Sequence, residues 1–254
     1  MNARWRTVWK SLWLAVTLLL CAPLPAKTVH FAIGDWEPLT SSNHPEKRAL
    51  ERVVREAYAL VGIDVEFSYY PWSRSALMVE RGQADGTFPW NLTLERREKF
   101  LSHQVSLLTS PSVFFYIKGT AFDWQTLDDL KHYRVGVTQG YKEETIYRER
   151  GIAAEVVPNE DSNFRKLLLG RIDVYMTTQI VGYEMIGNLF TPEERARFTH
   201  HPKVASTSEF FVLFTRQRNT SVEYARLLDE GLRKLHASGA FRRIMTEHGI
   251  GQPR

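Results

Sequence analysis

The same succession of predicted elements occurs twice in this chain, and this repetition constrains the fold more than any other feature. Each unit reads strand–helix–strand–helix–strand by its hydrophobic periodicity. Each unit also reaches its third strand through the spacing G-x-x-D, at Gly82–Asp85 and Gly170–Asp173. The first unit comprises 29–33, 47–61, 63–67, 72–81 and 86–88, and the second 134–137, 141–150, 154–157, 162–169 and 172–177. Because strands separated by such helices form parallel sheets, the sequence predicts an α/β protein with two lobes and a cleft between them.

Residues 1–26 have the pattern of a secretory signal peptide. Three basic residues precede an apolar stretch, 12–20, that is too short to span a bilayer, and Ala26 supplies the small residue expected before cleavage. The alternative is lipoprotein processing at Cys21, which is disfavoured because the residue before it, Leu20, is not small. We therefore predict a soluble periplasmic protein that is cleaved near Ala26.

The composition of the rest of the chain excludes several functions. The first 26 residues carry three of the 33 Lys and Arg residues and none of the 29 Asp and Glu residues, so the remainder has a net charge near +1. The basic pI of about 9.1 is therefore no argument for nucleic-acid binding. The only cysteine also lies in that segment, so no disulfide or Cys–metal site is expected after it. No metal-ligand spacing or nucleotide motif is present, and we predict neither a metal nor a cofactor.

One short segment gathers four kinds of side chain where a strand ends and a helix begins. Pro89 is expected to end the strand, which leaves Trp90 and Asn91 in a loop. Thr93 then begins a helix that carries Arg96. Open α/β sheets bind small ligands at such corners. The alternative is an ordinary corner with a solvated Arg96.

The order G-x-x-D, strand, loop, T-x-x-R occurs at Gly82, Asp85, Thr93 and Arg96. It resembles a motif of the bacterial extracellular solute-binding proteins of the polar amino-acid class. The resemblance continues at 133–140, 170–173 and 239–245, and so covers nearly all of the chain after Lys27. It implies the two-lobed type II periplasmic binding protein fold, in which two doubly wound α/β sheets are joined by a two-strand hinge.

Two long aromatic strands, 113–117 and 209–214, belong to neither repeated unit. In the family such strands run between the lobes as paired hinges. The expected division is therefore a signal peptide at 1–26, a first lobe at 27–116 and 209–254, and a second lobe at 117–208.

The resemblance also implies the ligand site. Trp36 and Trp72 match the positions of stacking aromatic residues, and Arg96 matches the arginine that grips the ligand carboxylate. Backbone N–H groups of a glycine loop at 139–141 would add to the same carboxylate. The resemblance supplies no general role for Arg74, and a surface salt bridge is at least as good an interpretation of it. The residues expected to line the cleft are Trp36, Trp72, Arg74, Trp90, Asn91, Thr93, Arg96, Gln139, Gly140, Tyr141, Thr177 and Thr178.

One departure from the family pattern bears on the ligand. The acidic residue that holds the α-amino group of an amino acid is expected five residues after Asp173, where this chain has Thr178, preceded by Thr177. A neutral hydroxyl cannot balance a buried ammonium group. Unless Glu37 or Glu184 substitutes, the sequence predicts a carboxylate ligand without a free α-ammonium group.

The sequence therefore predicts a binding protein, not an enzyme, which closes on a small polar ligand that is a carboxylate or resembles an amino acid. The expected partner is an ABC permease or a periplasmic sensor domain, and we expect a monomer. The alternative is an enzyme on the same scaffold that resembles cyclohexadienyl dehydratase. Glu37 and Glu184 are its candidate acid–base groups.

Overall fold

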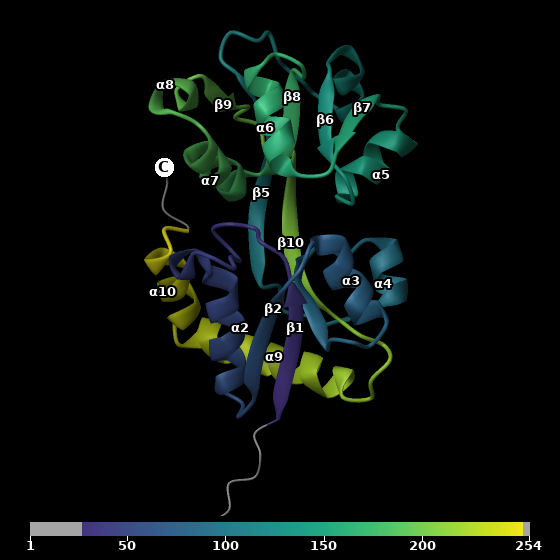
Figure 1. Ribbon diagram of the computed structural model, residues 1–254, viewed down its shortest axis with the longest axis vertical. Coiled ribbons are helices and arrows are strands. Elements are labelled where there is room, and N and C mark those ends of the chain that lie inside the picture. The colour runs from purple at the N-terminus through teal and green to yellow at the C-terminus, as the bar shows by residue number, and fades with distance from the viewer. Residues whose placement is uncertain (1–26, 251–254) are drawn as a thin grey trace, which may run out of the picture.

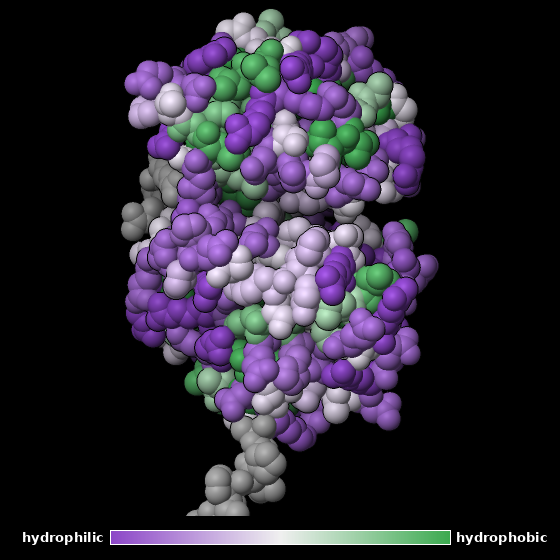
Figure 2. Space-filling view, viewed as in Figure 1, coloured by the Kyte–Doolittle hydropathy of each residue, from purple (hydrophilic) through white to green (hydrophobic). Residues whose placement is uncertain are grey.

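The computed structural model describes residues 27–250 as two α/β lobes arranged along the long axis of the molecule (Figure 1). The predicted signal peptide, with Cys21 and Ala26, lies outside the described residues. Within 27–250, no helix is long and apolar enough to cross a membrane. Both lobes are predominantly hydrophilic on the face shown in Figure 2.

The first lobe is built on a parallel sheet in which β1 lies between β2 and β3. Its helix α2 packs against α9 of the C-terminal segment, and the fit is close. A Cβ atom added at Gly231 of α9 would lie 2.1 Å from the carbonyl oxygen of Ala57. The elements are β1 (Thr28–Ile33), a 3-10 turn (Pro45–Lys47), α2 (Ala49–Ala59), β2 (Asp64–Tyr69), α3 (Trp72–Glu80), β3 (Gly86–Trp90), α4 (Leu94–Lys99), β4 (Leu101–Ser102), α9 (Ser221–Ala237) and α10 (Ala240–Glu247).

The second lobe repeats this arrangement, with β6 lying between β7 and β8 in a parallel sheet. Its elements are a 3-10 helix (Leu127–His132), β6 (Val135–Thr138), α5 (Lys142–Glu149), β7 (Ala154–Val157), α6 (Glu160–Leu168), β8 (Val174–Thr178), α7 (Gln179–Leu189), α8 (Pro192–Arg195) and β9 (Phe198–His200).

Two long strands join the lobes: β5 (Leu108–Ile117) and β10 (Ser206–Phe214), which pair with each other in antiparallel orientation. β10 also pairs with β3 of the first lobe, and β5 pairs with β8 of the second. The strand order is therefore continuous, β2-β1-β3-β10-β5-β8-β6-β7. Figure 1 shows these two strands running between the lobes.

The repeated G-x-x-D spacing has the same structural role in both lobes. The Asp85 carboxylate accepts a hydrogen bond from the backbone N–H of His30 (2.9 Å), and the Asp173 carboxylate accepts one from the N–H of Arg134 (2.7 Å). Each aspartate thus connects the start of the third strand to the first strand of its unit. An arginine completes each contact through Arg218 and Arg134.

The prediction that Pro89 ends its strand is wrong, because β3 continues through Trp90. The pairing of β3 with β10 is irregular at this point: Trp90 lies opposite Phe211 and Thr87 opposite Leu213. Proline has no N–H to donate, and such an irregularity is one of the places where a strand tolerates it.

Candidate ligand-binding site between the lobes

Arg96 is held in the first lobe by the loop that precedes it. The Thr93 hydroxyl caps α4 by accepting a hydrogen bond from the Arg96 N–H (3.2 Å). The guanidinium lies over the Trp90 ring, 4.5 Å from its centroid. That ring is itself fixed, because its Nε1 donates to the Thr87 hydroxyl (3.0 Å) and it forms a T-shaped contact with the Trp72 ring, with the ring centroids 5.4 Å apart. The segment thus holds the Arg96 guanidinium in a defined orientation.

The Arg96 side chain reaches across the cleft. Its Nη1 donates to the carbonyl of Asn91 (3.0 Å) in its own lobe, and its Nη2 donates to the carbonyl of Gly140 (2.9 Å) in the second lobe. Burial lowers the pKa of Arg96, so its charged form needs hydrogen-bond acceptors to be stable. Asn91 is anchored to the hinge, since its Nδ2 donates to the carbonyl of Glu209 (3.0 Å). The lobes are therefore closed on one another at this arginine.

A second contact crosses the cleft at Trp36, whose Nε1 donates to Oε2 of Glu160 (3.0 Å). Trp36 is 7% exposed, and its ring packs against Phe210 of β10. Glu160 is 3% exposed and also accepts hydrogen bonds from the hydroxyl groups of Tyr175, Thr177 and Tyr141. Burial raises the pKa of Glu160, and these four donors oppose the rise. The cleft thus holds a buried acidic group as well as an arginine.

A third group of cross-lobe contacts centres on Lys47. Its ammonium lies 2.9 Å from Glu37 in its own lobe and 3.0 Å from Glu184 on α7 of the second lobe. Asn188, also on α7, accepts a hydrogen bond from Lys47 (3.1 Å) and donates one to Glu37 (3.1 Å). Burial alone would raise the pKa of Glu37, but the hydrogen bonds from Lys47 and Ser41 outweigh it and lower that pKa.

In this closed form, the backbone N–H groups of the glycine loop are hydrogen-bonded within their own lobe. The Gly140 N–H donates to the Glu144 carboxylate (2.7 Å), the Gln139 N–H to Val157 and the Tyr141 N–H to Thr138. These N–H groups become available to a ligand carboxylate only if the loop changes its hydrogen bonds. The Gly140 carbonyl, by contrast, faces Arg96.

The other predicted site residues are distributed as follows. Thr177 contacts Glu160 directly, whereas Thr178 is buried at the start of α7 and makes no side-chain capping bond there. Trp72 packs over Gly34 and donates from Nε1 to the carbonyl of Asp35 (3.2 Å). Arg74 is exposed and lies over the Tyr70 ring at 4.9 Å, so the structure gives it a local contact.

Glu160 is not among the site residues predicted from the sequence, although the internal repeat contained the signal. In the first unit, Trp72 is the first residue of α3 and follows Pro71; in the second, Glu160 is the first residue of α6 and follows Pro158 and the cap Asn159. Placing the two units in register aligns Glu160 with a residue that was already a site candidate.

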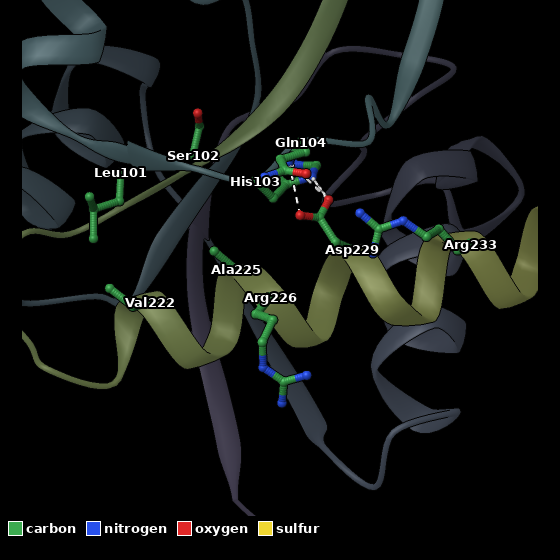
Figure 3. Close-up of a pocket in the computed structure, with 9 residues that line it drawn as sticks. All are labelled: Leu101, Ser102, His103, Gln104, Val222, Ala225, Arg226, Asp229 and Arg233. Carbon is green, nitrogen blue, oxygen red and sulfur yellow. Dashed lines mark hydrogen bonds and ion pairs between the residues drawn. The ribbon is translucent and has the colours of Figure 1, made fainter.

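One further surface feature lies away from this cleft. A surface cavity of about 300 Å³ borders α9 of the first lobe, where Asp229 accepts hydrogen bonds from the N–H groups of Gln104 and Val105 (Figure 3). These bonds fix the loop that leads into β5. Within 27–250, no group of three or more His, Cys, Asp or Glu side chains is arranged to hold a metal ion.

Comparison with models of known protein families and with curated protein sequences finds no match. Solved structures do match. A histidine kinase sensor domain similar to periplasmic binding proteins superposes with a TM-score of 0.73 at 17% identity, over 89% of this chain and 98% of that chain. An ancestral arginine-binding protein bound to arginine gives 0.71 at 16% identity, over 87% and 97%. The GluR0 ligand-binding core from Nostoc punctiforme, in complex with L-glutamate, gives 0.69 at 16% identity, over 85% and 97%.

The chain has the periplasmic binding protein fold. The predicted fold class, two α/β lobes joined by a two-strand hinge, is therefore confirmed. At this level of identity the similarity concerns the fold, and the function rests on the site of this chain.

Proposed function

We propose that this protein is a solute-binding protein whose lobes close on a small polar ligand through a carboxylate held by Arg96. The observation that carries the proposal is the pair of hydrogen bonds at this arginine, one within its own lobe and one across the cleft. Its guanidinium is oriented by Trp90, yet the acceptors on its two arms are neutral carbonyls, at Asn91 and Gly140. A carboxylate is a stronger acceptor for a guanidinium than a carbonyl and can bind both arms at once.

Binding and closure are coupled in this scheme. When the lobes separate, the contact between Arg96 and Gly140 is lost and one arm of the guanidinium is freed. A ligand carboxylate then takes the place of the carbonyl, and its other groups contact the second lobe. The differential affinity of the ligand for the closed form shifts the equilibrium between open and closed lobes.

The acid–base groups that an enzyme would need are engaged elsewhere. Glu37 and Glu184, the two candidates from sequence, both pair with Lys47. Glu160 accepts hydrogen bonds from four donors, which occupy both of its oxygen atoms and hold them in place. These contacts support binding without chemistry. The structures with this fold named above are binding proteins and a sensor domain.

The pattern of residues 1–26 and the fold support a periplasmic location. We infer that the chain is exported, cleaved near Ala26 and acts in the periplasm. There the closed form is recognised by an ABC permease or by a sensor domain.

A thermal-shift screen tests the proposal. Amino acids, amines, short peptides and carboxylates are added to the purified protein and to its Arg96→Ala variant. A ligand present at 100 times its Kd stabilises the folded state by about 2.7 kcal/mol. We expect at least one carboxylate-bearing compound to raise the Tm of the wild-type protein and not that of the variant. Stabilisation by amines alone, or equal stabilisation of both proteins, would contradict the proposal that Arg96 binds the ligand carboxylate.

A further inference from the structure

Glu160 is a buried acidic group that forms no ion pair with a basic side chain of residues 27–250. Its side chain is 3% exposed, and no Lys, Arg or His nitrogen of residues 27–250 lies within 4 Å of its carboxylate. Its hydrogen bonds come from an indole and from hydroxyl groups. These donors satisfy the oxygen atoms, but they bring no opposite charge.

Burial raises the pKa of Glu160, and its hydrogen-bond donors lower the cost of the ionised form. A chain of hydrogen bonds runs from the Asn163 amide through the Thr138 hydroxyl to the Tyr175 hydroxyl, which donates to Oε1 of Glu160 (2.9 Å). Glu160 is also the first residue of α6, where the helix dipole favours a negative charge. The second lobe therefore holds a carboxylate in a fixed orientation at the cleft.

Three of the four contacts to Glu160 come from its own lobe, and only one comes from the opposite lobe. That contact, from Trp36 Nε1 to Oε2, is broken when the lobes separate. Opening thus frees one acceptor position on Glu160, and that position faces the lobe that carries Arg96. A donor of ligand origin can occupy it, and a cationic nitrogen would also supply the missing charge.

We propose that Glu160 is the counter-charge for a cationic nitrogen of the ligand, which displaces the Trp36 indole from Oε2. This inference rests on the proposed function, because Arg96 takes the carboxylate of the same ligand. It replaces the expectation from Thr178 that the ligand has no ammonium group: the acidic group is present but comes from α6 instead of the end of β8. The site then selects ligands that carry both charges.

Matched pairs of probes test the inference by titration calorimetry. Each pair compares an amino acid with the same molecule lacking the α-amino group: L-glutamine with 4-carbamoylbutanoate, L-glutamate with glutarate, and L-arginine with 5-guanidinopentanoate. For the wild-type protein we expect the amino acid of at least one of the first two pairs to bind tenfold or more tightly than its partner. Glu160→Gln should abolish that preference by weakening the amino acid at least tenfold, while leaving the des-amino partner unchanged or tighter.

The outcomes separate this inference from the proposed function. If des-amino carboxylates bind as well as amino acids, or if Glu160→Gln weakens both members of a pair equally, Glu160 is not a ligand counter-charge. The proposal that Arg96 binds the ligand carboxylate then still stands. If no probe binds the wild-type protein, the inference and the carboxylate-binding function both fall.

Two further variants test the inference if Glu160→Gln fails to fold. Glu160→Asp retains the charge and should retain part of the preference for the amino acid. Trp36→Phe removes the competing N–H but keeps a ring against Phe210, so the preference should persist in this variant. Loss of the preference in Trp36→Phe would overturn the displacement of the indole by the ligand.

Discussion

Replacing Lys47 with methionine should shift the lobes toward the open form. Lys47 lies between two carboxylates, Glu37 at 2.9 Å and Glu184 at 3.0 Å, and only the second belongs to the opposite lobe. Methionine keeps the apolar stem but removes the charge, so two carboxylates then face each other across the closed cleft.

The magnitude follows from the burial of the three side chains, which are 20%, 22% and 14% exposed. An exposed ion pair contributes roughly 0.2–1 kcal/mol, and breaking a fully buried one costs roughly 3–5 kcal/mol. For these partly buried groups we expect a loss of about 1–2 kcal/mol from the closed form, which is a factor of about 5–30 in the closed–open ratio.

Small-angle X-ray scattering measures the effect as an increase in the radius of gyration of the ligand-free protein. Lys99→Met is the matched control, because Lys99 pairs with Glu95 and Glu80 on the surface of the first lobe only. Glu184→Gln added to Lys47→Met should reverse part of the change by removing the repulsion. A Lys47→Met protein with the radius of gyration of the wild type would refute the role of this bridge in closure.

Two further predictions concern stability. Gly231→Ala should lower the free energy of unfolding by about 1–3 kcal/mol and the Tm by roughly 2–12 °C, because the new methyl group meets the Ala57 carbonyl. Gly187→Ala, which has open space, should not lower the Tm. Burial alone would raise the pKa of Asp229, but hydrogen bonds from His103 and from the backbone N–H groups of Val105 and Gln104 outweigh it and lower that pKa. Since the folded form binds this proton less readily than the unfolded form, Asp229 stabilises the protein above its ordinary pKa and ceases to do so as the pH falls through the folded pKa. Urea unfolding should therefore show a shallower loss of stability in acid for Asp229→Asn than for the wild type.

The fold could be predicted from the sequence because it is encoded locally and twice. Hydrophobic periodicity placed the helices and parallel strands of both units, and the G-x-x-D spacing marked the same strand start in each. The structure gives that spacing a physical basis, since Asp85 and Asp173 bind the backbone of the first strand of their units. The end of β3 was mispredicted because a local rule for proline does not see the irregular pairing supplied by β10.

The site could be predicted only in part, because it forms between segments that are far apart in the chain. Arg96 and the Trp90 ring beneath it lie in one short segment, so their proximity could be predicted from the sequence. The partner of Trp36, by contrast, is Glu160, which is 124 residues away and belongs to the other lobe. The family pattern places the acidic residue at the position of Thr178 and does not predict a carboxylate supplied by a different helix.

The central claim is that Arg96 holds the carboxylate of the ligand. Calorimetric titration of the best ligand from the thermal-shift screen into the wild type, Arg96→Ala and Arg97→Ala tests it most directly. Arg97 is exposed on the same helix, and its substitution controls for a change in net charge. A charge-assisted hydrogen bond contributes about 1.5–3 kcal/mol, so Arg96→Ala should weaken binding by at least about tenfold. Arg97→Ala should bind as the wild type does. Equal affinity of Arg96→Ala and the wild type for that ligand would contradict the account.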